Sequence, residues 1–297
     1  MGLIAQAVAS GVVTGAVYAL IALSLVMIYK STDVINFAGG DLLMTGCYGA
    51  LMVLAANAPF WVAAMVSVLG IAVIGAGFDR LVLDRIARHT RGQDIMVAMV
   101  TATIGLSYVL KGTIRALGYA DEVRSLPPQF TGPPIMIGDV FLLRQDIGIL
   151  ACAALAGLIL FLFFRFTRLG RGLRATAEDP RAAALIGIPI RRMRMLIWAI
   201  ASAIAAFAGV LVAPKILMTP DMGGIVILAF AAGVIGGFTN FPGVVIGGIL
   251  LGVIENLVGL FVSAQAIAVA PFLVIMLVLV LRPQGLFGGG ALAIRKV

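Results

Sequence analysis

Charged side chains are scarce in this chain. Asp, Glu, Lys and Arg make up 11% of its 297 residues, whereas about a quarter of a typical soluble domain is charged. Acidic residues are the scarcer kind, with 13 Asp and Glu against 21 Lys and Arg. So few charges cannot cover the surface of an ordinary soluble enzyme or binding domain, and these classes are excluded.

Cysteine and histidine are also rare, and their scarcity argues against two kinds of site. Cys47 and Cys152 both lie inside apolar runs, so we expect neither a disulfide framework nor a metal site. The one histidine, His89, lies among arginines and is expected to be solvated.

Motifs of nucleotide-binding and hydrolytic enzymes are missing as well. The stretch from Gly105 to Lys111 comes nearest to a phosphate-binding loop, but its spacing is wrong and Gly112 follows the lysine. The sequence contains no H-E-x-x-H, paired C-x-x-C or G-x-S-x-G motif. We therefore do not expect an enzyme, and any ATP that the protein depends on must be bound by another chain.

Apolar sequence is abundant. Hydrophobic residues make up 62% of the chain, and its mean hydropathy is +1.15. Because about 20 helical residues cross the hydrocarbon core of a membrane, the long apolar runs predict an all-α polytopic membrane protein with about eight or nine helices in a single domain, residues 1–297. The predicted spans are Leu3–Tyr29, Ile35–Ala56, Phe60–Phe78, Ile95–Leu117, Ile147–Phe164 and Met195–Ala213, with two or three more in Gly223–Leu281.

Glycine is frequent and suggests both close packing and broken helices. Glycines spaced four residues apart let helix backbones approach closely. Examples are Gly11/Gly15, Gly243/Gly247 and Gly248/Gly252. An alternative is that Gly223–Gly252 forms a pore-lining or subunit-contact region. Clustered Gly and Pro between Gly236 and Gly243 predict a break in the helix there. Two segments, Gly223–Phe238 and Ile35–Ala56, are either continuous spans or broken, re-entrant ones.

The distribution of arginine predicts the orientation in the membrane. Positive charge marks cytoplasmic segments, which assigns Arg165–Arg194, Asp79–Asp94 and the tail Arg282–Val297 to the cytoplasm. The acidic, proline-containing Gly118–Asp146 is then external, and Lys30 after the first span favours an external N-terminus. The net charge of +8 is attributed to orientation and to anionic lipid. It is not attributed to nucleic acid, because aromatic residues are not interleaved with the arginines.

Ionisable residues inside apolar runs have two open interpretations. Asp41 and Glu255, with Asn256 beside it, are expected to face the bundle interior or a cavity, because an acid at a helix centre costs about 2.5–3.5 kcal/mol. They are either pathway or gating residues, or they form helix-to-helix hydrogen bonds. Lys111 and Arg115 lie one turn apart near the outer end of their span, and snorkelling to the interface accounts for them.

The basic segment Arg165–Arg194 contains a short helix with signals at both ends. Asp179 is a helix cap followed by Pro180 at the first helical position, and Thr176 with Asp179 offers an alternative capping box. Gly187 is suited to ending the helix. This helix would present Ala182, Ala183 and Ala184 to a docking partner, or would simply lie at the membrane interface.

Several motifs together resemble the LivH-type permease subunits of bacterial branched-chain amino-acid ABC importers. The similarity covers nearly the whole chain, and Gly39 stands where the family pattern often has His. The motifs that carry it are Gly15–Leu23, Val34–Asp41, Arg174–Asp179, Ala184–Ile188, the glycines from Gly236 to Gly248 after Ala229-Phe230, and Leu281–Phe287.

This resemblance implies an ABC importer permease fold in the bacterial inner membrane. Two permease subunits, commonly different chains, would form the pathway for branched-chain or similar amino acids. A periplasmic amino-acid-binding protein would deliver the solute. Two ABC ATPases carrying ATP-Mg would dock on a coupling helix at about Asp179–Gly187, and this chain would bind no cofactor. The residues expected to couple to the ATPases are Glu178, Asp179, Arg181, Ala182, Ala183, Ala184 and Gly187.

Polar residues in or near the apolar runs are the candidates for the solute pathway. They are Asn36, Asp41, Thr45, Thr101, Thr103, Ser107, Glu255 and Asn256. Two alternatives remain open. One is an ion-coupled secondary transporter or channel that uses Asp41 and Glu255, and the other is an ABC permease for urea or amides.

Overall fold

The computed structural model describes residues 2–90, 94–118, 124–138, 140–238 and 240–288. Parts of three predicted loops lie outside these residues: Arg91 in the Asp79–Asp94 segment, the acids Asp121, Glu122 and Asp139 in the outer loop, and the end of the basic tail. The elements are α1 (Gly2–Thr32), α2 (Gly39–Ala55), α3 (Phe60–Phe78), the π-helix η1 (Asp79–Leu83), α4 (Asp84–His89), α5 (Asp94–Ala116), β1 (Ile135–Ile137), β2 (Val140–Leu142), α6 (Arg144–Phe166), α7 (Arg168–Glu178), α8 (Pro180–Leu185), α9 (Ile190–Val212), the 3-10 helix η2 (Met222–Gly224), α10 (Ile225–Gly236), α11 (Phe241–Phe261), the 3-10 helix η3 (Gln265–Ala268) and α12 (Ala270–Leu281).

The prediction of an all-α polytopic membrane protein is confirmed. Six helices of the described chain are long and apolar enough to cross a membrane: Gly2–Thr32, Phe60–His89, Asp94–Ala116, Arg144–Phe166, Ile190–Val212 and Phe241–Phe261. Three apolar helices are shorter, namely Gly39–Ala55, Met222–Gly236 and Ala270–Leu281. The first two short helices fall in the segments that the sequence marked as broken or re-entrant.

The polar segments are more helical than predicted. Asp79–Asp94 was expected to be a loop, but the helix of α3 continues through η1 and α4 to His89. The stretch from Asp79 to His89 contains neither Gly nor Pro, so nothing in it ends the helix. Arg165–Arg194 is likewise mostly helical, because Thr167 caps α7 by accepting a hydrogen bond from the Gly170 N–H.

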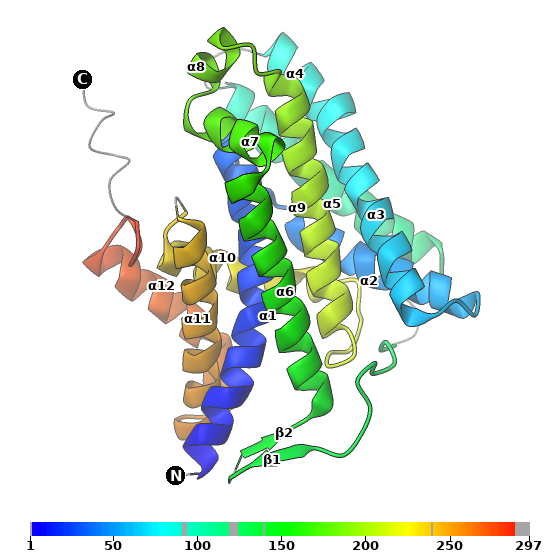
Figure 1. Cartoon of the computed structure of the whole chain (residues 1–297), viewed down its shortest axis with the longest axis vertical. Helices are drawn as coiled ribbons and strands as arrows, with labels where there is room; N and C mark the ends of the chain where they lie inside the picture. Colours follow the sequence, from blue (N-terminus) through cyan, green and yellow to red (C-terminus); the bar gives the residue numbers. More distant parts are fainter. Residues whose placement is uncertain (1, 91–93, 119–123, 139, 239, 289–297) are drawn as a thin grey trace. The chain divides into compact units, whose positions relative to one another are not determined.

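The chain divides into two compact units. Unit 1 contains Met1–Val26, Pro128–Ala154 and Val226–Val297, and unit 2 contains Met27–Pro127 and Leu155–Ile225. In unit 2, α2, α3 and α9 pack together (Figure 1). Trp198 and Tyr48 are fully buried there, and the Trp198 ring lies 5.4 Å from that of Phe78.

Unit 1 is built on the close contact between α1 and α11. A Cβ added at Gly11 would lie 2.6 Å from the Val253 Cα, and one at Gly15 would lie 2.6 Å from the Ile249 Cα. Gly248 faces Ala19 in the same way. The prediction that these glycines pack helices within the subunit is therefore confirmed, since a side chain at any of them would separate the two backbones.

The predicted break between Gly236 and Gly243 is also present. α10 ends at Gly236 and α11 begins at Phe241, and Gly237 adopts a positive φ of 84° that favours glycine. After α12, the chain returns to this break, where the Leu286 N–H donates to the Ile235 carbonyl at 2.8 Å.

Candidate functional site

The short helix α8 is closed at both ends by hydrogen bonds. At its start, Asp179 Oδ1 accepts from the Arg181 N–H at 2.9 Å and from the Ala182 N–H at 3.0 Å. At its end, Gly187 has φ +84°, and the N–H groups of Gly187 and Ile188 donate back into the helix at 3.0 Å, a Schellman arrangement. The predicted helix at Asp179–Gly187 is confirmed. The alternative capping box is wrong, because Thr176 lies inside α7 and donates to the Gly172 carbonyl.

The surface of α8 differs from the predicted alanine face. Ala182 and Ala184 are exposed, but Ala183 is buried in a helix that packs on α7 and α9 (Figure 1). Leu185 and Ile186 protrude instead, at 89% and 75% exposure. The sequence analysis missed this pair, although two bulky apolar residues directly before a helix-ending glycine in a polar segment were a usable signal.

The other predicted coupling residues surround this tip. Glu178, Asp179, Arg181 and Gly187 are all exposed. The structure thus brings the predicted coupling residues together in one turn and its flanks, with Ala183 as the member that faces inward.

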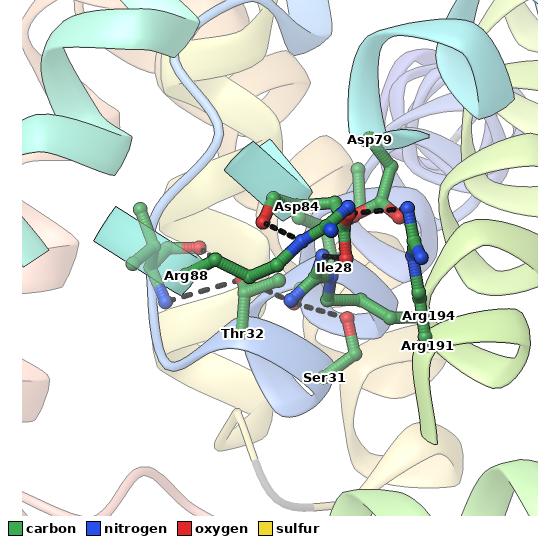
Figure 2. A network of polar contacts seen from close by, with 9 residues as sticks. Ile28, Ser31, Thr32, Asp79, Asp84, Arg88, Arg191 and Arg194 are labelled. Carbon is green, nitrogen blue, oxygen red and sulfur yellow. Dashed lines mark hydrogen bonds and ion pairs between the residues drawn. The ribbon is translucent and has the colours of Figure 1, made fainter. Parts of the chain in front are cut away.

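Behind α8, the start of α9 is held by a buried acid–arginine cluster, formed by Asp79, Asp84, Arg88, Arg191 and Arg194 (Figure 2). Asp79 is fully buried, and its Oδ1 accepts from Arg194 Nε at 2.6 Å. Asp84 contacts Arg88 and lies 2.5 Å from Arg191 and 3.6 Å from Arg194. Buried carboxylates of this kind require paired cations.

The acid–arginine cluster joins three segments of unit 2. Its acids lie in η1 and α4, and Arg191 and Arg194 lie in the first turns of α9. The end of α1 is beside it, where Ser31 and Thr32 each donate to the Ile28 carbonyl at 2.9 Å (Figure 2). The acidic partners of these arginines were not predicted from the sequence.

A second polar contact lies deeper in unit 2, between α5 and residues 36–41. Thr103, Ser107 and Lys111 are spaced by four residues and therefore share one face of α5. The Phe37 N–H donates to Thr103 Oγ1 at 3.4 Å, Ser107 lies near the Asp41 carboxylate, and Lys111 Nζ lies 3.7 Å from Asp41 Oδ1. We call this contact, from residues 36–41 to Thr103, Ser107 and Lys111, the polar seam.

The remaining predicted pathway residues do not all belong to the polar seam. Thr45 lies one turn after Asp41 and donates to its carbonyl at 2.6 Å, whereas Thr101 is exposed. Glu255 and Asn256 belong to unit 1. There Glu255 lies near Tyr18 of α1, and Asn256 Nδ2 donates to the Gly252 carbonyl of its own helix.

Lys111 and Arg115 were predicted to snorkel to the interface, and this prediction is wrong for Lys111. Lys111 Nζ lies between Asp41 and Asp221, at 3.7 and 4.0 Å. Arg115 lies 3.7 Å from Asp221. The sequence did not reveal this because Asp221 is distant in the chain and lies in a segment without periodicity.

Comparison with known proteins points to one family. Residues 7–281 match the family described as branched-chain amino acid transport system / permease component. The chain is 33% identical over 295 residues to the high-affinity branched-chain amino acid transport system permease protein LivH of Salmonella typhimurium, and 32% identical over 297 residues to that of Escherichia coli K12. It is 31% identical over 294 residues to the corresponding protein BraD of Pseudomonas aeruginosa. Each alignment covers 95% of both chains.

A solved structure, PsaBC from Streptococcus pneumoniae in complex with Fab, aligns with a TM-score of 0.46 at 13% identity. This alignment covers 90% of this chain and 89% of that one. The score is too low to establish a shared fold, so the family assignment rests on the sequence matches.

Proposed function

The chain belongs to the permease component family of branched-chain amino acid transport systems, and from this premise we propose how it works with its partners. It is the membrane-spanning permease subunit of an ABC importer, located in the inner membrane as a multi-pass protein. The names of its relatives do not favour an ion-coupled transporter or a urea permease.

The proposed assembly contains two permease subunits, of which the second is a different chain, and two ABC ATPases on the cytoplasmic side. An external binding protein delivers the amino acid. The absence of a nucleotide-binding motif from this sequence supports separate ATPases. ATP-Mg is then bound by those chains, and this subunit needs no cofactor.

The proposed docking point for an ATPase is the tip of α8. The observation that carries it is the exposure of Leu185 and Ile186 on a turn whose two ends are both capped. Adjacent exposed apolar side chains on a rigid turn suit insertion into a partner's groove, where such anchors supply most of the binding energy. Arg181 and Glu178 provide polar contacts at the rim.

Movement of α8 would reach the transmembrane helices through the acid–arginine cluster. Pro189 is the N-cap of α9, which begins a short turn after α8, and Arg191 and Arg194 then tie α9 to Asp79 and Asp84. Because the Arg194–Asp79 ion pair is buried, α8, α9 and the end of α3 would shift together when the ATPases close, a rigid-body transition.

The proposed orientation places α8 and the C-terminus in the cytoplasm and the N-terminus outside. The arginine-rich sequence around α7 and α8 supports it.

Within the membrane, the proposed solute pathway passes the polar seam, and Thr45 lies next to it. Thr101, Glu255 and Asn256 stay predictions for this pathway.

Docking at α8 is tested by purifying the complex through a tagged permease. We expect Leu185→Asp combined with Ile186→Asp to reduce the amount of copurified ATPase at least tenfold. Leu217→Asp is the matched control, because Leu217 is also exposed but lies beyond the opposite end of α9, and it should retain the ATPase. Normal copurification and normal amino-acid uptake in the double variant would disprove docking at this tip.

A further inference from the structure

Asp41 carries a buried oxygen that receives no hydrogen bond from the part of the chain that the structure describes. The side chain is 6% exposed, and this oxygen is Oδ1. Buried polar groups in native proteins are nearly always satisfied, so the unpaired Oδ1 indicates a place where a polar ligand completes the site.

Lys111 is near this oxygen but is not closely bound to it. Its Nζ lies 3.7 Å from Asp41 Oδ1 and 4.0 Å from Asp221 Oδ1. Both distances exceed the roughly 2.7–2.9 Å of a close charge-assisted hydrogen bond. The ammonium group of Lys111 therefore lies between two carboxylates and makes a close hydrogen bond with neither of them.

Gly223 and Ser107 both lie beside the Asp41 carboxylate. Gly223 of η2 lies against Gly40, and a Cβ on Gly223 would lie 2.8 Å from Asp41 Oδ1. A side chain at this position would press on the oxygen, so the close approach of η2 to Asp41 requires glycine. Ser107 is near the same carboxylate.

The exposure of the charged side chains increases from Asp41 on α2 to the basic residues of α5. Asp41 is buried, Lys111 is 30% exposed and Arg115, one turn further along α5, is mostly exposed. Charges arranged in this way lead from solvent towards the buried carboxylate and favour the entry of a charged or dipolar solute.

We propose that Asp41 and Lys111 bind the α-ammonium and α-carboxylate groups of the transported amino acid, with Ser107 as a positioning residue for Asp41. The inference rests on the proposed function and assigns residues to the head group of its substrate. The substrate ammonium binds at Asp41 Oδ1, and the substrate carboxylate binds Lys111. A zwitterion supplies one opposite charge to each of the two side chains, whereas a lone cation or anion would pair with only one of them. A neutral solute such as urea would not replace either ionic contact.

The first experiment measures leucine uptake by the whole reconstituted complex. We expect Asp41→Asn combined with Lys111→Gln to lower uptake at least fivefold while assembly with the ATPases and basal ATP hydrolysis persist. The double variant separates binding from a structural ion pair, because neutralising both partners leaves no unpaired buried charge. Thr113→Val is the matched control, since Thr113 is exposed on α5 and donates to its own helix, and it should transport as the wild type does.

A loss smaller than fivefold in the double variant would overturn the proposal. If the wild-type complex itself transports no branched-chain amino acid, the proposed function fails, and this result is distinguishable from failure of the site alone.

A second measurement uses the wild-type complex and does not depend on the folding of a variant. Lys111 is exposed enough for acetylation by an amine-reactive reagent, and mass spectrometry quantifies the modification. Because leucine's own amine consumes reagent, the rate is measured relative to exposed Lys215 in the same sample. We expect saturating leucine to slow acetylation of Lys111 at least threefold relative to Lys215, and urea at the same concentration to have no effect. Equal acetylation with and without leucine would contradict the assignment of Lys111.

Discussion

Arg194 and Asp79 are 115 positions apart in sequence, yet Arg194 Nε donates to Asp79 Oδ1 at 2.6 Å in the buried part of the acid–arginine cluster. This contact ties the start of α9, which follows the proposed docking helix α8, to the π-helical turn after α3.

Removing the buried acid is expected to destabilise unit 2 strongly. Asp79→Ala leaves Arg194 without its closest partner, and breaking a buried ion pair costs about 3–5 kcal/mol. Arg88→Ala is the control, because Arg88 is mostly exposed and Asp84 keeps Arg191 and Arg194. Thermal unfolding in detergent should show a much lower midpoint for Asp79→Ala, and equal midpoints for the two variants would contradict a structural role of the cluster.

The cap of α8 is expected to determine how firmly the docking tip is held. Asp179→Ala removes the acceptor for two backbone N–H groups, which costs about 1 kcal/mol. Asp179→Asn keeps an acceptor and serves as the control. Hydrogen exchange of the peptide covering residues 179–188 should become faster in Asp179→Ala and remain near the wild-type rate in Asp179→Asn, and unchanged exchange in both would show that the cap is unimportant.

The glycine contact between α1 and α11 predicts a sharp difference between two similar substitutions. Gly252→Ala places a methyl group against the Gly11 and Gly15 backbone, and such overpacking costs about 1–3 kcal/mol. Gly105→Ala in α5 meets no atom within 4 Å. Detergent unfolding should therefore distinguish the pair, and a neutral Gly252→Ala would contradict the close backbone contact in unit 1.

The proposed orientation predicts which surfaces a membrane-impermeant maleimide reaches in intact cells. In a background without Cys47 and Cys152, Leu143→Cys should be labelled from outside, because Leu143 is exposed beside β2. Leu185→Cys should be labelled only after the cells are opened. The reverse pattern would invert the topology inferred from the arginines.

The sequence predicted features that are determined locally. Apolar runs located the membrane helices, and Asp179, Pro180 and Gly187 predicted both ends of α8, because helix caps depend on a few adjacent residues. Two of the three short apolar helices, Gly39–Ala55 and Met222–Gly236, also fall in segments that were predicted as broken or re-entrant.

Features that depend on tertiary packing were not predictable in this way. The pairing of Arg194 with Asp79 and of Lys111 with Asp41 joins residues far apart in sequence. The inward direction of Ala183 depends on how α8 packs on α7 and α9, which a run of identical alanines cannot reveal. Of the predicted pathway residues, Asp41 on α2 and Ser107 on α5 lie near each other, and hydropathy alone does not distinguish them from exposed Thr101.

The most direct test of the central claim is leucine uptake into proteoliposomes that contain the complex purified through this chain, with its loaded binding protein. The account predicts uptake that requires ATP hydrolysis on the ATPase side and that persists when ionophores collapse all ion gradients. Leucine uptake driven by an ion gradient without ATP, or no uptake of branched-chain amino acids under any of these conditions, would contradict it.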